Sequence, residues 1–170
     1  AGHSYGEFVA LHVAGAFDLA TLIRLSEARG RAMVENGDPD RPGAMAAVAA
    51  DADTVGAAIA GLADVVLANR NSPRQTVIAG PRAAIDQAME ALAAAGLQAT
   101  AVPVSQAFHS PLMEPARGQF DAALAAVDWR ATHLPVYSNT TGAMHAAEPD
   151  AQRAVMGAHL VSPVEFTGMI

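Results

Sequence analysis

The residues most suggestive of chemistry form the pentapeptide Gly2-His3-Ser4-Tyr5-Gly6, which has the pattern Gly-x-Ser-x-Gly. Such a pattern places a serine on a tight turn between a strand and a helix, where its hydroxyl is exposed for nucleophilic attack. Both glycines are predicted to be required, because a side chain two residues before or after the serine would clash there. The pattern therefore predicts an acyl-transfer enzyme with Ser4 as nucleophile. The alternative is a glycine-rich helix start that Ser4 caps.

Arg29 is the second candidate because of its position on a predicted helix. At about 100° per residue it lies in the middle of the apolar face that contains Leu22 and Leu25. Arg31 falls on the opposite face. A guanidinium among apolar side chains is costly unless it meets an anion, and its planar fork fits a carboxylate. We expect Arg29 to bind a substrate carboxylate; an internal ion pair with a residue such as Glu7 is the alternative.

His109 is the candidate base for this nucleophile. It lies in the segment 105–111, a predicted loop that follows a strand and returns the chain to its first unit. A lone histidine is more often structural than catalytic, but a serine nucleophile needs a neighbouring base. We therefore expect His109 to approach Ser4.

Composition limits the class of protein. The 170 residues are 52% hydrophobic, enough for a packed core, and include no cysteine, which excludes disulfides and thiolate metal sites. The net charge is −7, and the ten basic residues are all arginines without a basic stripe, so nucleic acid is not an expected partner. The longest apolar stretch, 8–17, is too short to span a membrane. We expect a cytoplasmic protein.

Alternating helices and strands predict an α/β fold with two units. Helices are predicted at 6–14, 18–35, 54–62, 82–95, 116–127 and 151–160. Strands are predicted at 45–49, 64–68, 75–79, 98–104 and 134–138, with polar breaks at 36–43 and 69–73. The elements within 44–104 follow the β-α-β-β-α-β order of a ferredoxin-like subdomain. That subdomain would be inserted between 1–43 and 105–170, which form the main domain.

Both ends of the chain are expected to be truncated. The pentapeptide begins at the second residue, which leaves no room for the strand that precedes such a turn. The other end, 162–170, stops in an apolar run without a helix cap or a polar tail.

Several motifs together resemble the acyltransferase domains of polyketide and fatty acid synthases, the malonyl-CoA:acyl carrier protein transacylases. The motifs are Gly2-His3-Ser4-Tyr5-Gly6-Glu7, Ala28-Arg29-Gly30, 68–80, Ala107-Phe108-His109-Ser110-Pro111, 136–142 and 163–166. The resemblance covers essentially the whole chain. It implies an α/β-hydrolase-like main domain that carries the inserted subdomain.

The resemblance also implies a reaction and its partners. Ser4, deprotonated by His109, would take a malonyl group from malonyl-CoA and pass it to the phosphopantetheine thiol of an acyl carrier protein. The backbone N–H of Tyr5 would stabilise the oxyanion, and Arg29 would hold the malonyl carboxylate. Neither a metal nor a covalently bound cofactor is expected. Neighbouring synthase domains such as a ketosynthase are expected partners.

The residues beside His109 bear on selectivity. Domains of this family that take malonyl groups typically carry His-Ala-Phe-His, and methylmalonyl-selective ones carry Tyr-Ala-Ser-His. This chain has Gln106-Ala107-Phe108-His109, which keeps the phenylalanine and departs at the first position. A Phe108 ring would crowd a branching methyl group, which favours malonyl, although one methyl group contributes only about 1–3 kcal/mol.

Two other classes of function remain open. A serine esterase or thioesterase of the α/β-hydrolase type shares the turn but needs an acidic residue beside its histidine. Here the acidic residues Asp51, Asp53, Asp64 and Asp86 fall within the small subdomain. The other class is a non-catalytic domain that only docks a carrier protein, although packing alone does not demand Ser4, Arg29 and His109 together.

Overall fold

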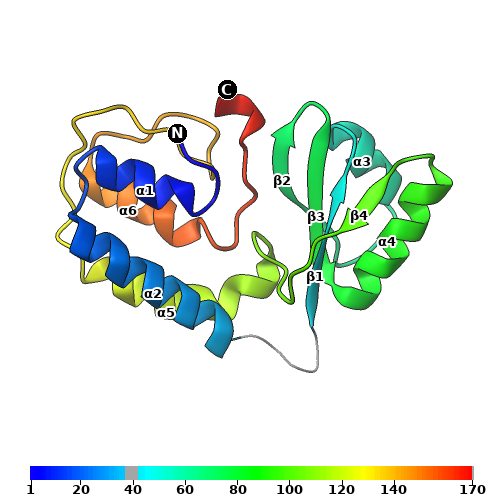
Figure 1. Cartoon of the computed structure of the whole chain (residues 1–170), viewed down its shortest axis with the longest axis horizontal. Coiled ribbons are helices and arrows are strands. Elements are labelled where there is room, and N and C mark those ends of the chain that lie inside the picture. The colour runs from blue at the N-terminus through cyan, green and yellow to red at the C-terminus, as the bar shows by residue number, and fades with distance from the viewer. Residues whose placement is uncertain (37–41, 170) are drawn as a thin grey trace.

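The chain folds into two lobes in a computed structural model that describes residues 1–36 and 42–169 (Figure 1). The helical lobe contains α1 (Gly6–Val13), α2 (Leu19–Glu35), α5 (Glu114–Ala125), α6 (Pro149–Ala158) and the 3-10 helices η1 (Pro111–Met113) and η2 (Thr167–Met169). The sheet lobe contains β1 (Gly43–Val48), α3 (Ala52–Ile59), β2 (Val66–Ser72), β3 (Gln75–Pro81), α4 (Arg82–Ala94) and β4 (Ala99–Ala101). The predicted break at 36–43 falls largely outside the described residues.

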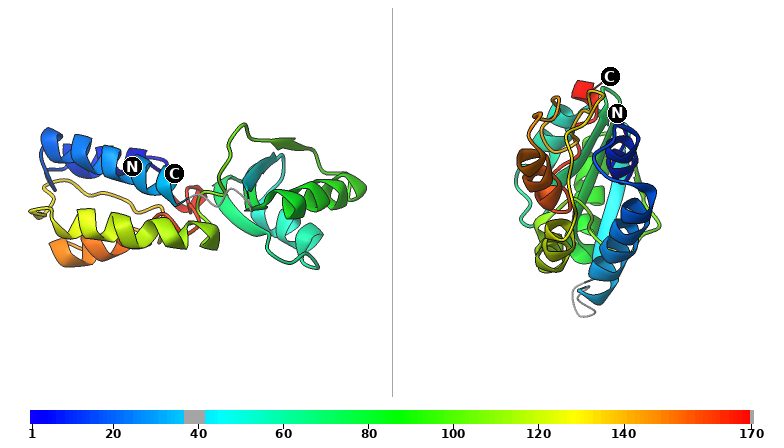
Figure 2. Two further views of the ribbon diagram at one scale, coloured as in Figure 1. Left: turned by 90° about the horizontal axis from the view of Figure 1, so that it is seen from below. Right: turned by 90° about the vertical axis from the view of Figure 1, so that its left-hand side faces the viewer.

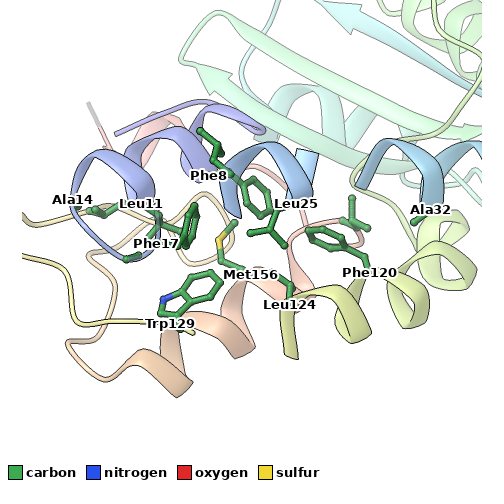
Figure 3. Packing of buried hydrophobic residues seen from close by; sticks show 14 of the residues in the cluster. Phe8, Leu11, Ala14, Phe17, Leu25, Ala32, Phe120, Leu124, Trp129 and Met156 are labelled. Atoms are coloured by element: carbon green, nitrogen blue, oxygen red, sulfur yellow. The ribbon is translucent and has the colours of Figure 1, made fainter. Parts of the chain in front are cut away.

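One apolar core holds the helical lobe together. Helix α2 packs against α1 and α5, and α5 packs against α6. Phe8 and Leu11 of α1 meet Leu25 of α2, Phe120 of α5 and Met156 of α6 in this core (Figure 3). In the part of the chain that the structure describes, no helix has the length and apolar character needed to cross a membrane.

The ends and faces of these helices follow the sequence signals. Asp18 precedes α2, and its side chain accepts a hydrogen bond from the Thr21 N–H at 2.8 Å, as expected of an N-cap. Gly15, just after α1, has a φ of +93°, which favours glycine. On the exposed face of α2, Arg31 lies 2.6 Å from Glu27. The predicted solvent-exposed position of Arg31 is therefore confirmed.

The sheet lobe has the predicted β-α-β-β-α-β order of elements. Its strands are arranged β2-β3-β1-β4, and each neighbouring pair is antiparallel. Ala46 and Val48 of β1 pack with α3 and α4 on one face, whereas Met45 belongs to the cluster on the other. That second face carries Ala107, so the chain returning to the helical lobe covers it. Strand β4 is shorter than the predicted 98–104.

The predicted turn at 69–73 is wrong over its first four residues, which continue strand β2; only Pro73 lies in the turn before β3. Asn69 and Arg70 pair with β3 on one side, with an irregular register. On the other side Arg70 N–H donates to Val164 O at 2.8 Å, and Val164 N–H donates to Ala68 O at 2.9 Å. Pairing on both edges keeps this polar segment extended, although its residue types favour a turn.

The predicted strand at 134–138 is also wrong. The segment folds back on itself, with a single isolated bridge between Tyr137 and Met144. His145 N–H donates to Val136 O at 2.8 Å across the same loop. Within the described ranges, the segment has no neighbouring strand with which to form a ladder. The helical lobe therefore contributes no sheet there, and its α/β-hydrolase-like character stays a prediction.

The two lobes meet at a narrow waist (Figure 2). Besides the Val164 pairing, Thr167 donates its hydroxyl to the Arg70 carbonyl at 2.9 Å, and Arg70 forms an ion pair with Glu165. His3 Nε2 lies 2.7 Å from Asn71 Oδ1. These contacts join the turn around Ser4 and the C-terminal segment to the same edge of β2.

Candidate active site

Ser4 lies on a tight turn at the start of α1. Its φ is +50°, a conformation that residues other than glycine seldom adopt. The N–H groups of Gly6 and Glu7 donate to the carbonyls of His3 and Ser4 at 2.9 Å each, which closes the turn. A Cβ atom at Gly2 would overlap the Gly6 carbonyl. The prediction of a steric requirement for glycine is confirmed at this position.

At Gly6 the same prediction is not borne out, because a Cβ atom there would meet no described atom within 4 Å apart from its chain neighbours and its own helix backbone. We expect Gly2→Ala to lower the free energy of unfolding by about 3 kcal/mol through overpacking. Gly6→Ala should instead leave it unchanged or raise it by up to about 1 kcal/mol, because alanine favours a helix. Urea unfolding of both variants measures these free energies, and an equal loss of unfolding free energy in the two variants would contradict the prediction.

His109 is held against Ser4 in the orientation that a general base needs. Its Nε2 lies 2.8 Å from Ser4 Oγ, and its Nδ1 lies 3.1 Å from His159 O and 3.2 Å from Ser162 O. Carbonyl oxygens only accept hydrogen bonds, so we assign the ring proton to Nδ1. The Nε2 lone pair then accepts the Ser4 hydroxyl hydrogen, which is the arrangement for deprotonating the serine.

The surroundings of His109 keep the imidazole neutral. Burial and then the nearby Arg29 charge lower its pKa from 6.5 to about 4, although hydrogen bonds to the His159 and Ser162 carbonyls raise it. A neutral base at neutral pH is ready to accept a proton.

We expect the acid limb of kcat/KM for Ser4 acylation to have its midpoint near pH 4, because the base is active above its pKa of about 4. Folding stability should fall in the same direction: unfolding restores the pKa to 6.5, so stability is lost as the pH drops from 6.5 to about 4. Brief pH jumps with recovery at neutral pH separate the two effects. A reversible limb near 6.5 would contradict this assignment.

Arg29 lines the same cavity as Ser4 and His109. Its Nε is buried and has no hydrogen-bond acceptor among residues 1–36 and 42–169. Burial lowers the pKa of Arg29, yet an arginine stays charged. Glu7 contacts Asn139 and His145 instead. The alternative of an Arg29–Glu7 ion pair is therefore wrong.

These side chains line one cavity of about 290 Å³ between the lobes. The helical lobe and the returning loop provide His3, Ser4, Arg29, Phe108 and His109, and the sheet lobe provides Met45, Asn69, Val102 and Val104. The predicted nucleophile, base, carboxylate-binding residue and Phe108 thus come together. Gln106 is half-buried in the same loop but is not among the lining residues.

Comparison with known proteins shows the family to which the chain belongs. The family described as acyl transferase domain matches residues 1–170. The chain belongs to the acyl transferase domain family. It is 39% identical over 172 residues to the malonyl CoA-acyl carrier protein transacylase of Escherichia coli O157:H7, covering 98% of this chain and 55% of that protein.

Solved structures of acyltransferases also superpose closely on this chain. The acyltransferase domain of an iterative polyketide synthase in enediyne biosynthesis superposes with a TM-score of 0.91 at 38% identity, over 98% of this chain and 44% of that one. A malonyl-transacylase in complex with its type II polyketide synthase acyl carrier protein gives 0.92 at 34%, over 98% and 55%. The chain therefore spans about half the length of these relatives.

Tyr5, the residue directly after Ser4 in this acyltransferase domain, is the predicted oxyanion-hole residue through its backbone N–H. Tyr5 occupies the N-cap position of α1. The N-terminal end of a helix carries a partial positive charge, which favours an anion. A negatively charged oxygen formed next to Ser4 would therefore meet both this N–H and the positive end of α1.

Some residues of the site were not expected from the sequence. The carbonyls of His159 and Ser162 orient His109, and a carbonyl carries no residue-type signal. Asn69 lines the cavity from a segment that was predicted to be a turn. The Asn139 side chain accepts a hydrogen bond from the Ser4 N–H and donates one to the Gly2 carbonyl. Its motif, 136–142, was a sequence signal, but no chemistry could be attached to it.

Proposed function

We propose that this acyltransferase domain moves a malonyl group from CoA to the phosphopantetheine thiol of an acyl carrier protein, through an ester on Ser4. The observation that carries the proposal is the 2.8 Å contact between Ser4 Oγ and His109 Nε2 in a cavity that Arg29 also lines. The nucleophile, its base and a cation for a carboxylate face the same space. No resident cofactor or metal is required for this chemistry.

The first half of the reaction forms the acyl enzyme. His109 Nε2 takes the Ser4 proton while Oγ attacks the thioester carbonyl carbon, and the oxyanion is stabilised by the Tyr5 N–H and α1. Collapse breaks the carbon–sulfur bond, and His109 returns its proton to the CoA sulfur. In the second half the carrier thiol attacks the ester, with its proton passing through His109 back to Ser4. Arg29 holds the malonyl carboxylate throughout.

Intact-mass measurement of the full-length protein after brief exposure to malonyl-CoA tests the proposal. We expect one malonyl adduct on the wild type and none on a Ser4→Ala variant. Addition of a phosphopantetheinylated acyl carrier protein should remove the adduct and appear as malonyl carrier protein. A folded wild type that forms no adduct would contradict the proposal and favour a domain that only docks a carrier protein.

A thioesterase or esterase reading is less well supported by the environment of His109. Two backbone carbonyls orient the ring, whereas a serine hydrolase of that type uses a carboxylate. Release of the malonyl group to water without a carrier thiol is the outcome that would favour it.

Phe108 supports malonyl as the preferred extender group. It is half-buried and lines the cavity beside Ser4 and His109, where its ring limits the room for a branching methyl group. We expect Phe108→Ser to narrow the preference for malonyl-CoA over methylmalonyl-CoA by about tenfold. Competition for Ser4 between the two thioesters measures this; equal loading of both by the wild type would contradict the role of Phe108. Gln106 would act only indirectly.

The same proposal assigns the lobes and the partners. Residues 44–104 would be the ferredoxin-like subdomain inserted between 1–43 and 105–170 of an α/β-hydrolase-like main domain, which the strand order β2-β3-β1-β4 supports. The acceptor would be an acyl carrier protein, the kind of partner named for the related malonyl-transacylase. Neighbouring synthase domains such as a ketosynthase would complete a cytoplasmic enzyme.

A further inference from the structure

Three buried polar residues lie directly behind the Ser4 turn and do not line the cavity. Glu7, Asn139 and His145, here called the Glu7 cluster, have exposed fractions of 0%, 0% and 9%. Burying a carboxylate completely is costly unless it is paired and hydrogen-bonded. None of the steps above uses these groups, so their burial requires another explanation.

Asn139 connects the cluster to both sides of the turn. Its side-chain Oδ1 accepts the Ser4 N–H at 2.9 Å, and its Nδ2 donates to the Gly2 carbonyl at 2.7 Å. Its backbone carbonyl accepts the Glu165 N–H at 2.7 Å. With the two bonds to Glu7 described next, every polar atom of Asn139 has a partner.

Glu7 decides which way the Asn139 amide faces. Its Oε2 accepts from Asn139 Nδ2 at 2.7 Å and from the Asn139 backbone N–H at 2.8 Å, and its Oε1 lies 2.6 Å from His145 Nε2. A carboxylate only accepts hydrogen bonds, so the amide must turn its nitrogen toward Glu7. Its oxygen is then the atom that faces the Ser4 N–H. A flipped amide would place two oxygens against each other.

This orientation bears on Ser4 because the turn is conformationally strained. A serine with a φ of +50° persists only where its surroundings hold it. Asn139 fixes the carbonyl of Gly2 and the N–H of Ser4, two groups that bracket His3. The direction of Ser4 Oγ toward His109 depends on this local backbone.

We propose that Asn139, oriented by the buried Glu7, is a positioning residue for the Ser4 nucleophile. The proposal rests on the proposed function, since it assigns the residue to the acylation of Ser4. Asn139 touches no substrate and acts by holding the turn at the start of α1. His145 supports it by holding the second oxygen of Glu7.

The test compares rate constants for Ser4 modification in the full-length protein. Malonyl-CoA is one reagent, and a fluorophosphonate, whose fluoride is displaced by an activated serine oxygen, is the other. We expect Asn139→Ala to lower both rate constants per folded molecule by about 100-fold, as misplacement of a reacting group by about 1 Å does. The malonyl-CoA concentration that gives half the maximal rate should stay within about twofold, because the residue binds no substrate.

A buried amide elsewhere in the same lobe provides the matched control. Gln152 is also fully buried and bonds to Trp129 Nε1 at 3.0 Å and Ala146 O at 2.8 Å, away from the turn. Gln152→Ala should lower thermal stability and leave both rate constants unchanged. If Gln152→Ala and Asn139→Ala slow the reaction equally, or Asn139→Ala reacts as the wild type does, the proposal is wrong.

An isosteric variant keeps the test decisive if Asn139→Ala does not fold. Glu7→Gln preserves volume but replaces one of the two accepting carboxylate oxygens with an NH₂ group, which weakens the hold on either Asn139 or His145, and we expect about a tenfold loss of both rate constants. An unchanged rate in Glu7→Gln would overturn the role of Glu7. The two reagents separate the proposals: a wild type that reacts with the fluorophosphonate but not with malonyl-CoA refutes the donor assignment and leaves the positioning test intact.

Discussion

Replacing His109 with alanine is expected to lower the rate of Ser4 acylation by about 10⁴-fold. The reason is that no described group other than His109 Nε2 lies within hydrogen-bonding distance of Ser4 Oγ, at 2.8 Å. Without it the serine stays a neutral hydroxyl, which is a weak nucleophile. Quenched-flow intact-mass measurements with malonyl-CoA, on protein shown to be folded by circular dichroism, give the rate.

A second histidine serves as the control for this variant. His12 is half-buried on α1, its Nδ1 lies 2.9 Å from Phe17 O, and it does not line the cavity. His12→Ala should acylate at the wild-type rate per folded molecule. Retention of more than a tenth of the wild-type rate by His109→Ala would show that another base serves Ser4.

The parts of the site that could be predicted are those with a local signature. The Gly-x-Ser-x-Gly pattern pointed to Ser4, and the 3.6-residue period pointed to Arg29 on the apolar side of its helix. The structure brings both to one cavity together with His109. The start of α2 was predicted for the same reason, because the Asp18 cap acts within one turn.

The parts that escaped prediction depend on contacts between distant residues. Asn139 lies 135 positions from the Ser4 N–H that it accepts and 132 from Glu7, and no spacing rule links such positions. The polar segment 69–72 stays extended because Val164, also distant in sequence, pairs with its edge. At 134–138 the sequence suggested a buried strand, but strand formation also needs a partner.

Replacing Arg29 with alanine is expected to reverse the preference of the site between charged and uncharged acyl groups. A carboxylate held by two charge-assisted hydrogen bonds loses about 3–6 kcal/mol when both are removed. We therefore expect kcat/KM for malonyl-CoA to fall by about 10³-fold. Acetyl-CoA, which has no carboxylate, leaves the buried guanidinium of the wild type unpaired, so Arg29→Ala should raise kcat/KM for acetyl-CoA.

One control replaces another arginine of the same helix, and the other keeps a positive charge at position 29. Arg31 is exposed on the opposite face of α2 and pairs with Glu27, so Arg31→Ala should leave both substrates unaffected. Arg29→Lys keeps the charge but not the planar fork, and its kcat/KM for malonyl-CoA should fall between those of the wild type and Arg29→Ala. Parallel losses for malonyl-CoA and acetyl-CoA in Arg29→Ala would mean that Arg29 supports the cavity rather than the carboxylate. Only a substrate-dependent loss identifies the guanidinium as the group that recognises the acid.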